Sequence, residues 1–253
     1  MSKKAVGIDI GGTGIKGALV DVKKGSLISD RIRVETPEGG RPDDIARVVA
    51  ELVTSLPGIK DGIPVGICFP AVVRHGKTMS AANVSSEWIG LDAVALFEKA
   101  LGRKVHVLND ADAAGVAEVK FGAAKDNDGL VIMTTLGTGI GTALFIEGKL
   151  VPNAELGHLE IDGVDYETKA AYSAKERENL SFDDWAKRLQ KYYSTLERLF
   201  SPDLFVVGGG ISKQHEEFLP KLNLAAPIVP AIKRNNAGIL GAAALAYRHS
   251  KTK

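Results

Sequence analysis

The sequence has one cysteine and no long apolar run, and each lack excludes a class of protein. The single cysteine, Cys68, excludes an internal disulfide framework and any zinc or iron–sulfur site built from several cysteines. No apolar run approaches the roughly 20 residues that span a bilayer, and no signal-peptide pattern precedes the first strand-like segment. We therefore expect a cytoplasmic protein with no membrane partner.

The chain also has almost no net charge. Its 253 residues contain 32 lysines and arginines against 31 aspartates and glutamates, which leaves a formal charge of +1. This balance provides no overall basic field for nucleic acid, and we expect no nucleic-acid partner. Apolar residues make up 45%, and the length fits one elaborate domain or two small ones.

Glycine is the residue in excess, with 28 positions. An alternating β-branched segment, Ala5–Ile10, stops at Gly11–Gly14, and another strand-like segment follows. The same pattern returns in the second half, with a turn at Gly137–Gly139. At an offset of 125 residues, six of the eight positions that start at Gly12 and Gly137 are identical. This agreement indicates a duplicated strand–turn–strand unit, and chance identity at glycine-rich turns is the alternative.

Hydrophobic periodicity places the remaining elements. Apolar residues at helical spacing predict helices, and short β-branched runs predict strands. The expected strands are Ile15–Val22, Ser26–Glu35, Pro64–Phe69, Lys104–Leu108, Gly129–Leu136, Gly141–Val151 and Asp203–Val207. The expected helices are Arg41–Leu56, Leu91–Leu101, Ala111–Phe121 and Ala237–Tyr247, with a polar, helical stretch over Glu160–Phe200.

The order of these elements indicates the fold class. Strands followed by helices in both halves predict an α/β chain of two related domains with a cleft between them. We expect one domain over residues 1–108, completed by a C-terminal helix over 238–253, and a second domain over 109–237. No linker or low-complexity tract separates the two.

The glycine–threonine turns are the first candidates for chemistry. Gly12–Gly17 fits the G-x-G-x-x-G fingerprint of dinucleotide-binding proteins, but that fingerprint needs a helix at its third glycine, whereas these residues predict a hairpin. A glycine hairpin lets backbone N–H groups approach a phosphate closely. Asp9 is placed to hold a hydrated Mg²⁺, and Lys16 adds a positive charge. An ordinary tight turn is the alternative.

A second candidate is the pair Asn109-Asp110, where a strand ends and a helix begins. Aspartate is a preferred N-cap residue, so capping is one interpretation of Asp110. The other is catalytic, because strand ends of α/β folds carry functional side chains. A carboxylate there can take the proton from a hydroxyl that attacks phosphorus.

Two further segments carry polar or glycine-rich patterns. Glu155, His158 and Glu167 place two carboxylates and an imidazole within 13 residues, a set that suits the hydroxyls of a sugar. Plain surface polarity is the alternative. Gly208–Gly210 follows an apolar strand and either lets a flat ligand lie against the backbone or forms a simple turn.

Five motifs occur in the order Asp9–Lys16 (DIGGTGIK), Asn109–Gly115 (NDADAAG), Leu136–Gly141 (LGTGIG), Glu155–His158 (ELGH) and Gly208–Ser212 (GGGIS). In this order they resemble the ROK sugar kinases, which belong to the superfamily of hexokinase and actin. With Asn83 in AANVSSEW and no zinc loop, the chain is similar to the actinobacterial polyphosphate glucokinases. We expect Trp88 of that segment to lie in the core.

The resemblance implies an actin-like (ribonuclease H-like) fold, an activity and its substrates. A phosphoryl group would pass from inorganic polyphosphate, ATP or both to the 6-hydroxyl of glucose, with mannose as a further acceptor and Mg²⁺ as cofactor, in a monomer or homodimer. Asp110 would be the general base. Sugar hydroxyls would be bound by Asn83, Asn109, Asp110, Glu155, His158 and Glu167. The donor would be bound by Asp9 (through hydrated Mg²⁺), Gly11, Gly12, Thr13, Gly14, Lys16, Gly137, Thr138, Gly139, Gly208, Gly209 and Gly210.

The donor and the chemistry leave alternatives open. A polyphosphate chain needs cations along a groove, although solvated helix faces explain basic residues equally well. The candidate cations are Lys187, Arg188, Lys191, Arg198, Lys213, Lys233 and Arg234. The rival functions are an ATP-only sugar kinase, a sugar-binding regulator without catalysis, and a nicotinamide-dependent dehydrogenase.

One departure from the family pattern gives the first prediction. Many ROK members hold a structural zinc through a histidine and a cysteine cluster in the segment that corresponds to His158–Glu167, and here that segment has no cysteine. Because structural zinc sites use four cysteine or histidine ligands, we expect elemental analysis of the purified protein to find no stoichiometric zinc. One zinc ion per chain would contradict this prediction.

Overall fold

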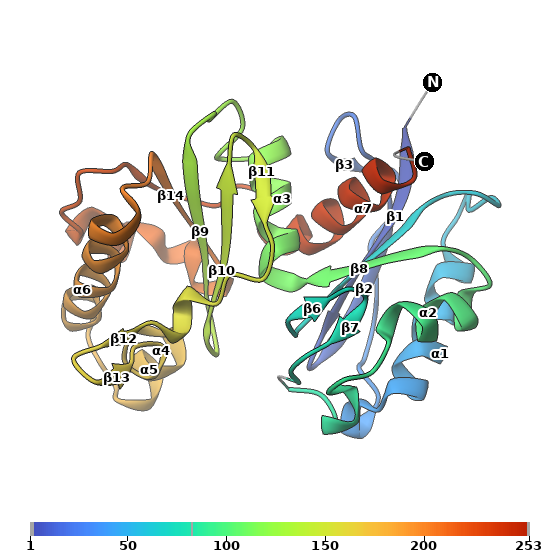
Figure 1. The fold of residues 1–253 in the computed structure, drawn as a ribbon, viewed down its shortest axis with the longest axis horizontal. Helices are drawn as coiled ribbons and strands as arrows, with labels where there is room; N and C mark the ends of the chain where they lie inside the picture. Colours follow the sequence, from blue (N-terminus) through green and yellow to red (C-terminus); the bar gives the residue numbers. More distant parts are fainter. Residues whose placement is uncertain (1–2, 82, 252–253) are drawn as a thin grey trace. The chain divides into compact units, whose positions relative to one another are not determined.

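The structure, a computed structural model, describes residues 3–81 and 83–251. The chain divides into two compact units. Unit 1 contains the residues up to Ala117 together with those from Asn236 onward, and unit 2 contains Glu118–Asn235. Each unit is built on its own mixed sheet (Figure 1).

The sheet of unit 1 has the order β3-β2-β1-β5-β8, and β4 also pairs with β2. An antiparallel hairpin, β1–β2, is followed by β5 and β8, which run parallel to β1. The strands are β1 (Lys4–Gly11), β2 (Gly14–Asp21), β3 (Ser26–Leu27), β4 (Ile32–Val34), β5 (Val65–Phe69) and β8 (Val105–Asn109), with a separate small hairpin of β6 (Val73–Arg74) and β7 (Lys77–Thr78).

The single strand expected over Ser26–Glu35 is wrong, because the structure divides it into β3 and β4. Ser29 lies between these two strands, and its hydroxyl oxygen accepts a hydrogen bond of 3.0 Å from the backbone N–H of Leu19. The N–H of Leu19 thus bonds to a side chain in place of a backbone carbonyl, although the Leu19 carbonyl oxygen still accepts from Ile28 N and Ser29 N, and regular pairing with β2 occurs on either side of this point.

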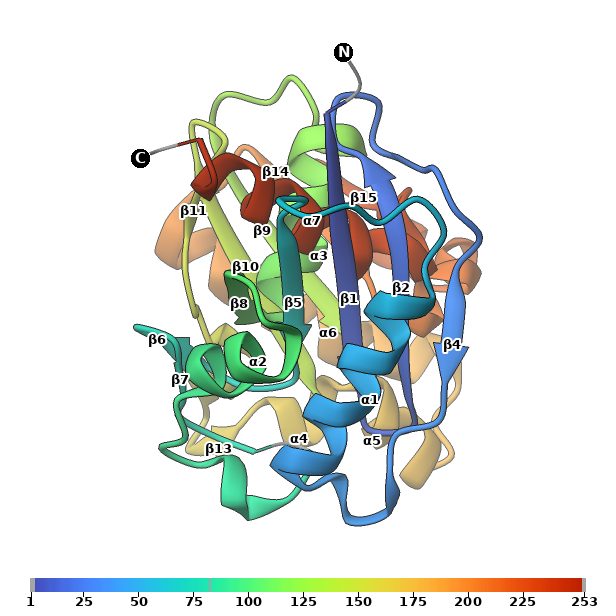
Figure 2. The same ribbon diagram turned by 90° about the vertical axis from the view of Figure 1, so that its right-hand side faces the viewer.

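The helices of unit 1 cover both faces of its sheet. Helices α1 and α2 lie on one face and α7 on the other (Figure 2). Trp88 is fully buried beside the rings of Phe69 and Phe97, as expected from the sequence. The helical segments are η1 (Glu38–Gly40), α1 (Pro42–Ser55), η2 (Ser86–Trp88), α2 (Ala93–Leu101) and α7 (Ala237–His249), and η6 (Arg234–Asn236) spans the boundary where the chain returns from unit 2.

Helix α7 packs directly against the backbone of β1 and β5. A Cβ atom at Gly7 would lie 1.9 Å from the carbonyl oxygen of Ile239, and one at Gly66 would lie 2.0 Å from that of Ala242. Both distances are far below van der Waals contact. Only glycine at these two strand positions permits the helix to lie so close, and the small residues of α7 complete the fit.

Helix α3 (Asp110–Phe121) crosses the boundary between the units. The sequence places this boundary between Leu108 and Asn109, whereas the compact units meet after Ala117. A Cβ atom at Gly241 of α7 would lie 1.7 Å from the carbonyl oxygen of Ala113. The first two turns of α3 therefore pack with α7 as part of unit 1.

The sheet of unit 2 has the order β11-β10-β9-β14-β15. It repeats the plan of unit 1, because an antiparallel hairpin, β9–β10, is followed by two strands parallel to β9. The hairpins β1–β2 and β9–β10 are the duplicated strand–turn–strand unit that the repeated sequence pattern predicts. The strands are β9 (Leu130–Leu136), β10 (Ile140–Ile146), β11 (Lys149–Val151), β14 (Leu204–Gly208) and β15 (Ile228–Pro230).

The sequence predicts a helical stretch over Glu160–Phe200, but the first part of this stretch is not helical. It begins with a hairpin of β12 (Glu160–Ile161) and β13 (Val164–Asp165), whose turn residues Asp162 and Gly163 both have positive φ. Asp-Gly is the sequence signal for such a turn. The helical segments of unit 2 are η3 (Leu156–His158), α4 (Glu167–Ala170), α5 (Tyr172–Arg177), α6 (Phe182–Phe200), η4 (Gly210–Glu217) and η5 (Leu219–Lys221).

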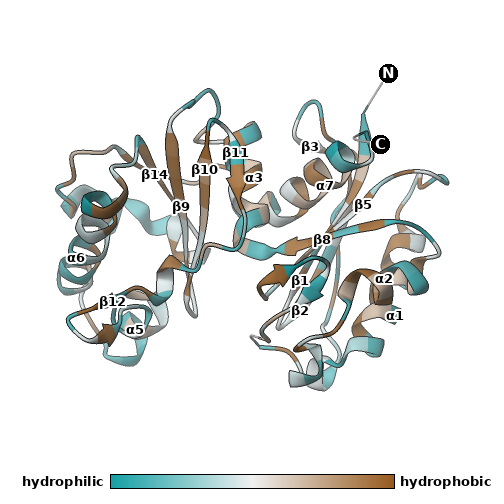
Figure 3. Cartoon of the chain, viewed as in Figure 1, coloured by the Kyte–Doolittle hydropathy of each residue, from teal (hydrophilic) through white to brown (hydrophobic). Residues whose placement is uncertain are grey.

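Apolar residues follow the strands of both sheets (Figure 3). In unit 2 they meet the inner face of α6, where Trp185, Leu189 and Tyr192 are fully buried. Over residues 3–81 and 83–251, no helix is both long and apolar enough to cross a membrane.

The packing of α7 against α3 gives the second prediction. Gly241→Ala places a methyl group against the backbone of Ala113, and we expect overpacking of this kind to cost about 1–3 kcal/mol. Thermal denaturation should show a fall in Tm of roughly 3–10 °C. Gly210→Ala is the control, because a Cβ there meets nothing within 4 Å and its φ is not positive. Equal melting of the two variants would contradict the close contact.

Candidate active site

The first glycine–threonine turn joins β1 to β2. Asp9 and Lys16 face each other across the hairpin, and Lys16 Nζ lies 3.2 Å from Asp9 Oδ2. Gly17 lies inside β2 rather than at the start of a helix. The dinucleotide fingerprint therefore lacks the helix that it needs, and the hairpin prediction is confirmed.

The carboxylate of Asp9 is held at the end of its strand by three neighbours. Besides Lys16, the thiol of Cys68 donates to Oδ1 over 3.4 Å, and a Cβ atom at Gly238 would lie 3.1 Å from Asp9 Cγ. Burial, followed by the charges of Asp9 and Asp110, raises the pKa of the Cys68 thiol, which therefore stays protonated as a donor. The side chain of Asp9 remains one-fifth exposed.

The backbone of this first turn is held by side chains. Thr36 Oγ1 donates to the carbonyl oxygen of Gly11 over 2.5 Å, and the Arg33 guanidinium donates to that of Thr13 over 3.1 Å. A Cβ atom at Gly12 would lie 2.8 Å from Asn83 Cβ. Asn83 therefore lies against the turn, so two motifs far apart in the sequence meet there.

At the junction of β8 and α3, Asn109 and Asp110 take different roles. Asn109 is buried, and its amide oxygen accepts hydrogen bonds from the N–H groups of Ala111 and Asp112 at 2.8 and 3.1 Å. The N-cap is therefore Asn109, and the capping interpretation of Asp110 is wrong. Asp110 is exposed, and its Oδ1 accepts a hydrogen bond of 2.8 Å from Ala111.

The capping role also limits what Asn109 can do for a sugar. Its amide nitrogen donates to the carbonyl oxygen of Ala71 over 3.2 Å. The amide oxygen already accepts two hydrogen bonds, and one of the two amide N–H groups is used. The group that the Asn109 side chain has left for a ligand is therefore its second N–H.

The second glycine–threonine turn, Gly137–Gly139, joins β9 to β10. All three of its carbonyl oxygens accept hydrogen bonds: Gly137 from Ser173 N (3.0 Å), Thr138 from Ser173 Oγ (2.6 Å) and Gly139 from Gly137 N (3.0 Å). Among the described residues, the N–H groups of Thr138 and Gly139 donate to no acceptor. The turn therefore presents donors and keeps its acceptors occupied.

Glu167 and Gly157 bring the polar residues of unit 2 to the same turn. Glu167 Oε2 accepts a hydrogen bond of 2.6 Å from Ile140 N, and a Cβ atom at Gly139 would lie 2.4 Å from this oxygen. A Cβ atom at Gly157 would lie 2.1 Å from the carbonyl oxygen of Ile140. The ELGH segment packs against the start of β10 because its third residue is glycine.

The glycine run at the end of β14 also packs against the second turn. Gly209 has φ +85°, and a Cβ atom there would lie 2.2 Å from the carbonyl oxygen of Leu136. A side chain at this position is excluded by both the backbone conformation and the contact. Within unit 2, residues 136–140 are therefore in contact with Glu167, with the ELGH segment and with the glycine run of residues 208–210.

Electrostatics distinguishes the two charged residues of the ELGH segment. His158 Nδ1 lies 2.8 Å from Asp165 Oδ2, and this hydrogen bond, with the charges of Glu167, Asp165 and Glu155, raises the pKa of His158. Partial burial raises the pKa of Glu155, an effect opposed by the charge of His158. The segment therefore offers an imidazole with increased proton affinity beside a carboxyl group.

Comparison with known proteins shows which family shares these motifs. The family model described as "ROK family" matches residues 5–172. The polyphosphate glucokinase of Mycobacterium tuberculosis (strain H37Rv) is 46% identical over 238 residues, which cover 94% of this chain and 89% of the relative.

The chain belongs to the ROK family.

Two solved structures share the fold over nearly the whole chain. The inorganic polyphosphate/ATP-glucomannokinase of Arthrobacter sp. strain KM has a TM-score of 0.91 and 53% identity, covering 97% of this chain and 99% of that one. The ROK glucokinase of Streptomyces griseus, solved with glucose and AMPPNP, has a TM-score of 0.81 and 26% identity, with coverage of 97% and 99%. The α/β, actin-like fold class expected from the sequence is confirmed.

The basic residues considered for a polyphosphate groove fall into two groups. Three of the four on α6 are paired with carboxylates: Lys187 with Asp184 (2.7 Å), Arg188 with Glu178 (2.5 Å), and Lys191 with Asp162. Salt bridges of this kind reduce the charge that each cation offers to a polyanion. Among the described residues, no carboxylate pairs with Arg198, Lys213, Lys233 and Arg234.

Sequence reasoning did not single out the residues that hold the turns. Ser173, Thr36 and Arg33 carry no motif, and each lies more than 20 residues along the chain from the turn or on another strand. Serine, threonine and arginine are common on protein surfaces, so their type gives no signal. Their roles follow only from tertiary contacts.

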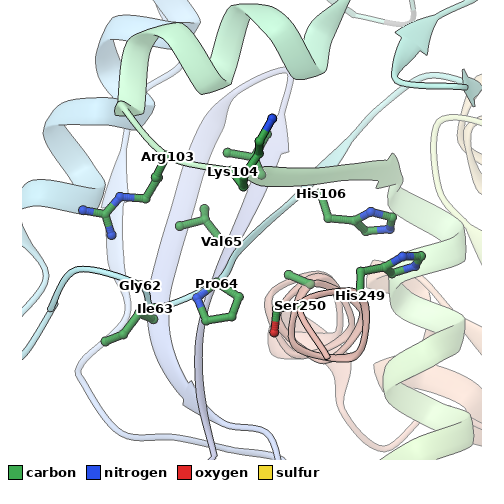
Figure 4. A pocket seen from close by; sticks show the side chains of 11 residues that line it. Gly62, Ile63, Pro64, Val65, Arg103, Lys104, His106, His249 and Ser250 are labelled. Atoms are coloured by element: carbon green, nitrogen blue, oxygen red, sulfur yellow. The ribbon is translucent and has the colours of Figure 1, made fainter. Parts of the chain in front are cut away.

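A cavity of about 580 Å³ in unit 1 contains none of the predicted site residues. It lies at the amino ends of β5 and β8, whereas Asn109 lies at the carboxyl end of β8. The imidazole rings of His106 and His249 stack at the side of this cavity, and their ring centroids are 4.1 Å apart (Figure 4). Burial lowers the pKa of His106 to about 4, so this ring is neutral near pH 7.

The His158–Asp165 pair gives the third prediction. Asp165→Asn removes the carboxylate that accepts the Nδ1–H, so we expect the pKa of His158, measured by NMR titration, to fall. Because the folded-state pKa is raised, the stabilisation from this pair is complete below the unfolded value of 6.5 and is lost as pH rises through the folded value.

Asp162→Asn is the matched control for this titration. Asp162 lies in the same β12–β13 hairpin but pairs with Lys191. We expect this variant to leave the pKa of His158 close to that of the unmodified protein. A His158 pKa that is the same in both variants would show that Asp165 does not set it.

Proposed function

We propose that the chain is a kinase that transfers a phosphoryl group from inorganic polyphosphate or ATP to the 6-hydroxyl of glucose. The observation that carries the proposal is the second turn, where two N–H groups are available and every carbonyl oxygen is occupied. Such an arrangement favours the oxygens of a phosphate over any cation. Similarity to a polyphosphate glucokinase over 94% of the chain supports the choice of donor and acceptor.

Asp110 is proposed as the general base. It is exposed, and it follows a buried residue that caps α3, so its backbone position is fixed while its carboxylate can meet a hydroxyl. In the proposed step it takes the proton of the 6-hydroxyl as that oxygen forms a bond to phosphorus and the donor oxygen leaves. Asp110 then holds the proton that the sugar has lost.

The sugar is proposed to be held by Asn83, Asn109, Glu155, His158 and Glu167. Glu155 and Glu167 accept hydrogen bonds from sugar hydroxyls, and Asn109 donates its remaining amide N–H. When protonated, His158 donates through Nε2, because Nδ1 already faces Asp165. Mannose is a proposed second acceptor, supported by the name of the similar polyphosphate/ATP-glucomannokinase.

The donor segments are proposed to be the two turns and the glycine run of residues 208–210. Within residues 3–81 and 83–251, no three metal-binding side chains converge on one point. Mg²⁺ typically uses one or two carboxylates with water and phosphate oxygens, so the one-fifth exposed carboxylate of Asp9 fits an ion held through water. When bound, the ion neutralises charge on the transferring phosphoryl group.

The fourth prediction tests the base. Asp110→Asn should reduce kcat for glucose 6-phosphate formation by a factor on the order of 10² or more, while glucose still binds. The measurement is a coupled assay for glucose 6-phosphate with Mg²⁺, using polyphosphate in one reaction and ATP in the other. Glucose binding is followed separately by calorimetry.

Asp43→Asn is the control for this variant. Asp43 is exposed and lies in the first turn of α1, as Asp110 does in α3, so both substitutions remove a carboxylate from the start of a helix. We expect normal turnover from Asp43→Asn. Normal turnover from Asp110→Asn would remove its assignment as base, and no product with either donor would remove the proposed function.

A further inference from the structure

Ser173 contacts the second turn through two different groups. Its backbone N–H donates to the carbonyl oxygen of Gly137 over 3.0 Å, and its hydroxyl donates to that of Thr138 over 2.6 Å. Ser173 belongs to the short helix α5, and it is half-buried. One residue therefore holds two consecutive peptide units.

The geometry of the peptide bond makes this contact directional. In a planar trans peptide, the C=O of one residue and the N–H of the next point in opposite directions. The carbonyl of Gly137 shares its peptide with the N–H of Thr138, and the carbonyl of Thr138 shares its peptide with the N–H of Gly139. By holding both carbonyls, Ser173 fixes both N–H groups so that they point away from it.

Among the described residues, only Ser173 forms hydrogen bonds to the peptide that joins Gly137 to Thr138 and to the one that joins Thr138 to Gly139. Gly137 and Gly139 lie on either side of Thr138, and glycine adopts backbone conformations of either sign of φ at small cost. A rotated peptide would direct a carbonyl oxygen toward a bound anion in place of an N–H, and an anion is repelled by that dipole.

We propose that Ser173 is a positioning residue for the phosphoryl donor, because it orients the N–H groups of Thr138 and Gly139 toward the phosphate. This inference rests on the proposed function, since it takes the turn as a phosphate-binding segment. Ser173 itself does not touch the donor in this role.

The first turn has a related contact. Thr36 Oγ1 donates to the carbonyl oxygen of Gly11, whose peptide carries the N–H of Gly12. A hydroxyl from outside the hairpin therefore orients an N–H group of this turn as well. The two turns are related by the sequence repeat, but Thr36 lies in the loop between β4 and η1 whereas Ser173 lies in α5, so the contact is made differently in each unit.

The experiment measures donor and sugar binding separately. Calorimetry gives the Kd of tripolyphosphate, AMPPNP and glucose for the unmodified protein, Ser173→Ala and Ser173→Thr. We expect Ser173→Ala to weaken both phosphate compounds roughly tenfold, the effect of one lost hydrogen bond, and to change the Kd of glucose less than about twofold. Ser173→Thr keeps a hydroxyl and should recover most of the affinity.

Ser55→Ala is the matched control. Ser55 Oγ also donates to a backbone carbonyl, that of Leu52 over 2.8 Å, but it lies in α1. We expect it to leave all three dissociation constants unchanged. In turnover assays, the KM for the donor should rise in Ser173→Ala, with the KM for glucose unchanged.

The outcomes separate this inference from the proposed function. The inference is overturned if Ser173→Ala binds tripolyphosphate as tightly as the unmodified protein does. It is also overturned if Ser173→Ala loses donor and glucose affinity equally and Ser173→Thr does not recover them. In either case, normal turnover of the unmodified protein leaves the kinase proposal standing. If Ser173→Ala selectively weakens tripolyphosphate and the unmodified protein forms no glucose 6-phosphate, the inference holds and the kinase proposal fails.

Discussion

The close approach of α7 to the sheet of unit 1 is the constraint on which the position of Asp9 depends. Gly7 and Gly66 remove the side chains that would separate the helix from β1 and β5. The start of α7 then reaches the end of β1, where Gly238 lies against the carboxylate of Asp9 and the thiol of Cys68. The protein combines tight apolar packing with the placement of a charged group, because both depend on the same absence of Cβ atoms.

Unit 2 uses the same device around residues 136–140. Gly139 lies against Glu167, Gly157 against Ile140, and Gly209 against Leu136. These glycines serve close approach between segments, and only Gly209 of the three also has a positive φ. The glycine segments of unit 2 thus pack directly against one another.

Hydrogen bonding gives the two turns their polarity. A tight turn has both donors and acceptors at its tip, and a phosphate distinguishes between them. Side chains from other elements occupy the acceptors: Arg33 and Thr36 in unit 1, and Ser173 in unit 2. Carboxylates similarly pair with three cations of α6, Lys187, Arg188 and Lys191, so that helix offers a polyanion less charge than its composition indicates.

The sequence by itself determined most of the element types, the duplicated strand–turn–strand unit and the family. Period-2 and period-3.6 patterns depend only on neighbouring residues, so β1, β2, α1 and α6 lie within a residue or two of where they were expected or inside the expected range. The Asp162-Gly163 hairpin and the interruption at Ser29 were missed, because one turn or one side-chain bond outweighs composition locally.

Only the tertiary structure decided how the site residues are held. Asn109 rather than Asp110 caps α3, because the cap is the residue whose side chain reaches the free N–H groups. Ser173 and Thr36 became visible through hydrogen bonds to residues distant in the sequence. A sequence records which groups are present, whereas hydrogen bonds between distant segments depend on where packing places them, and no local pattern carries that information.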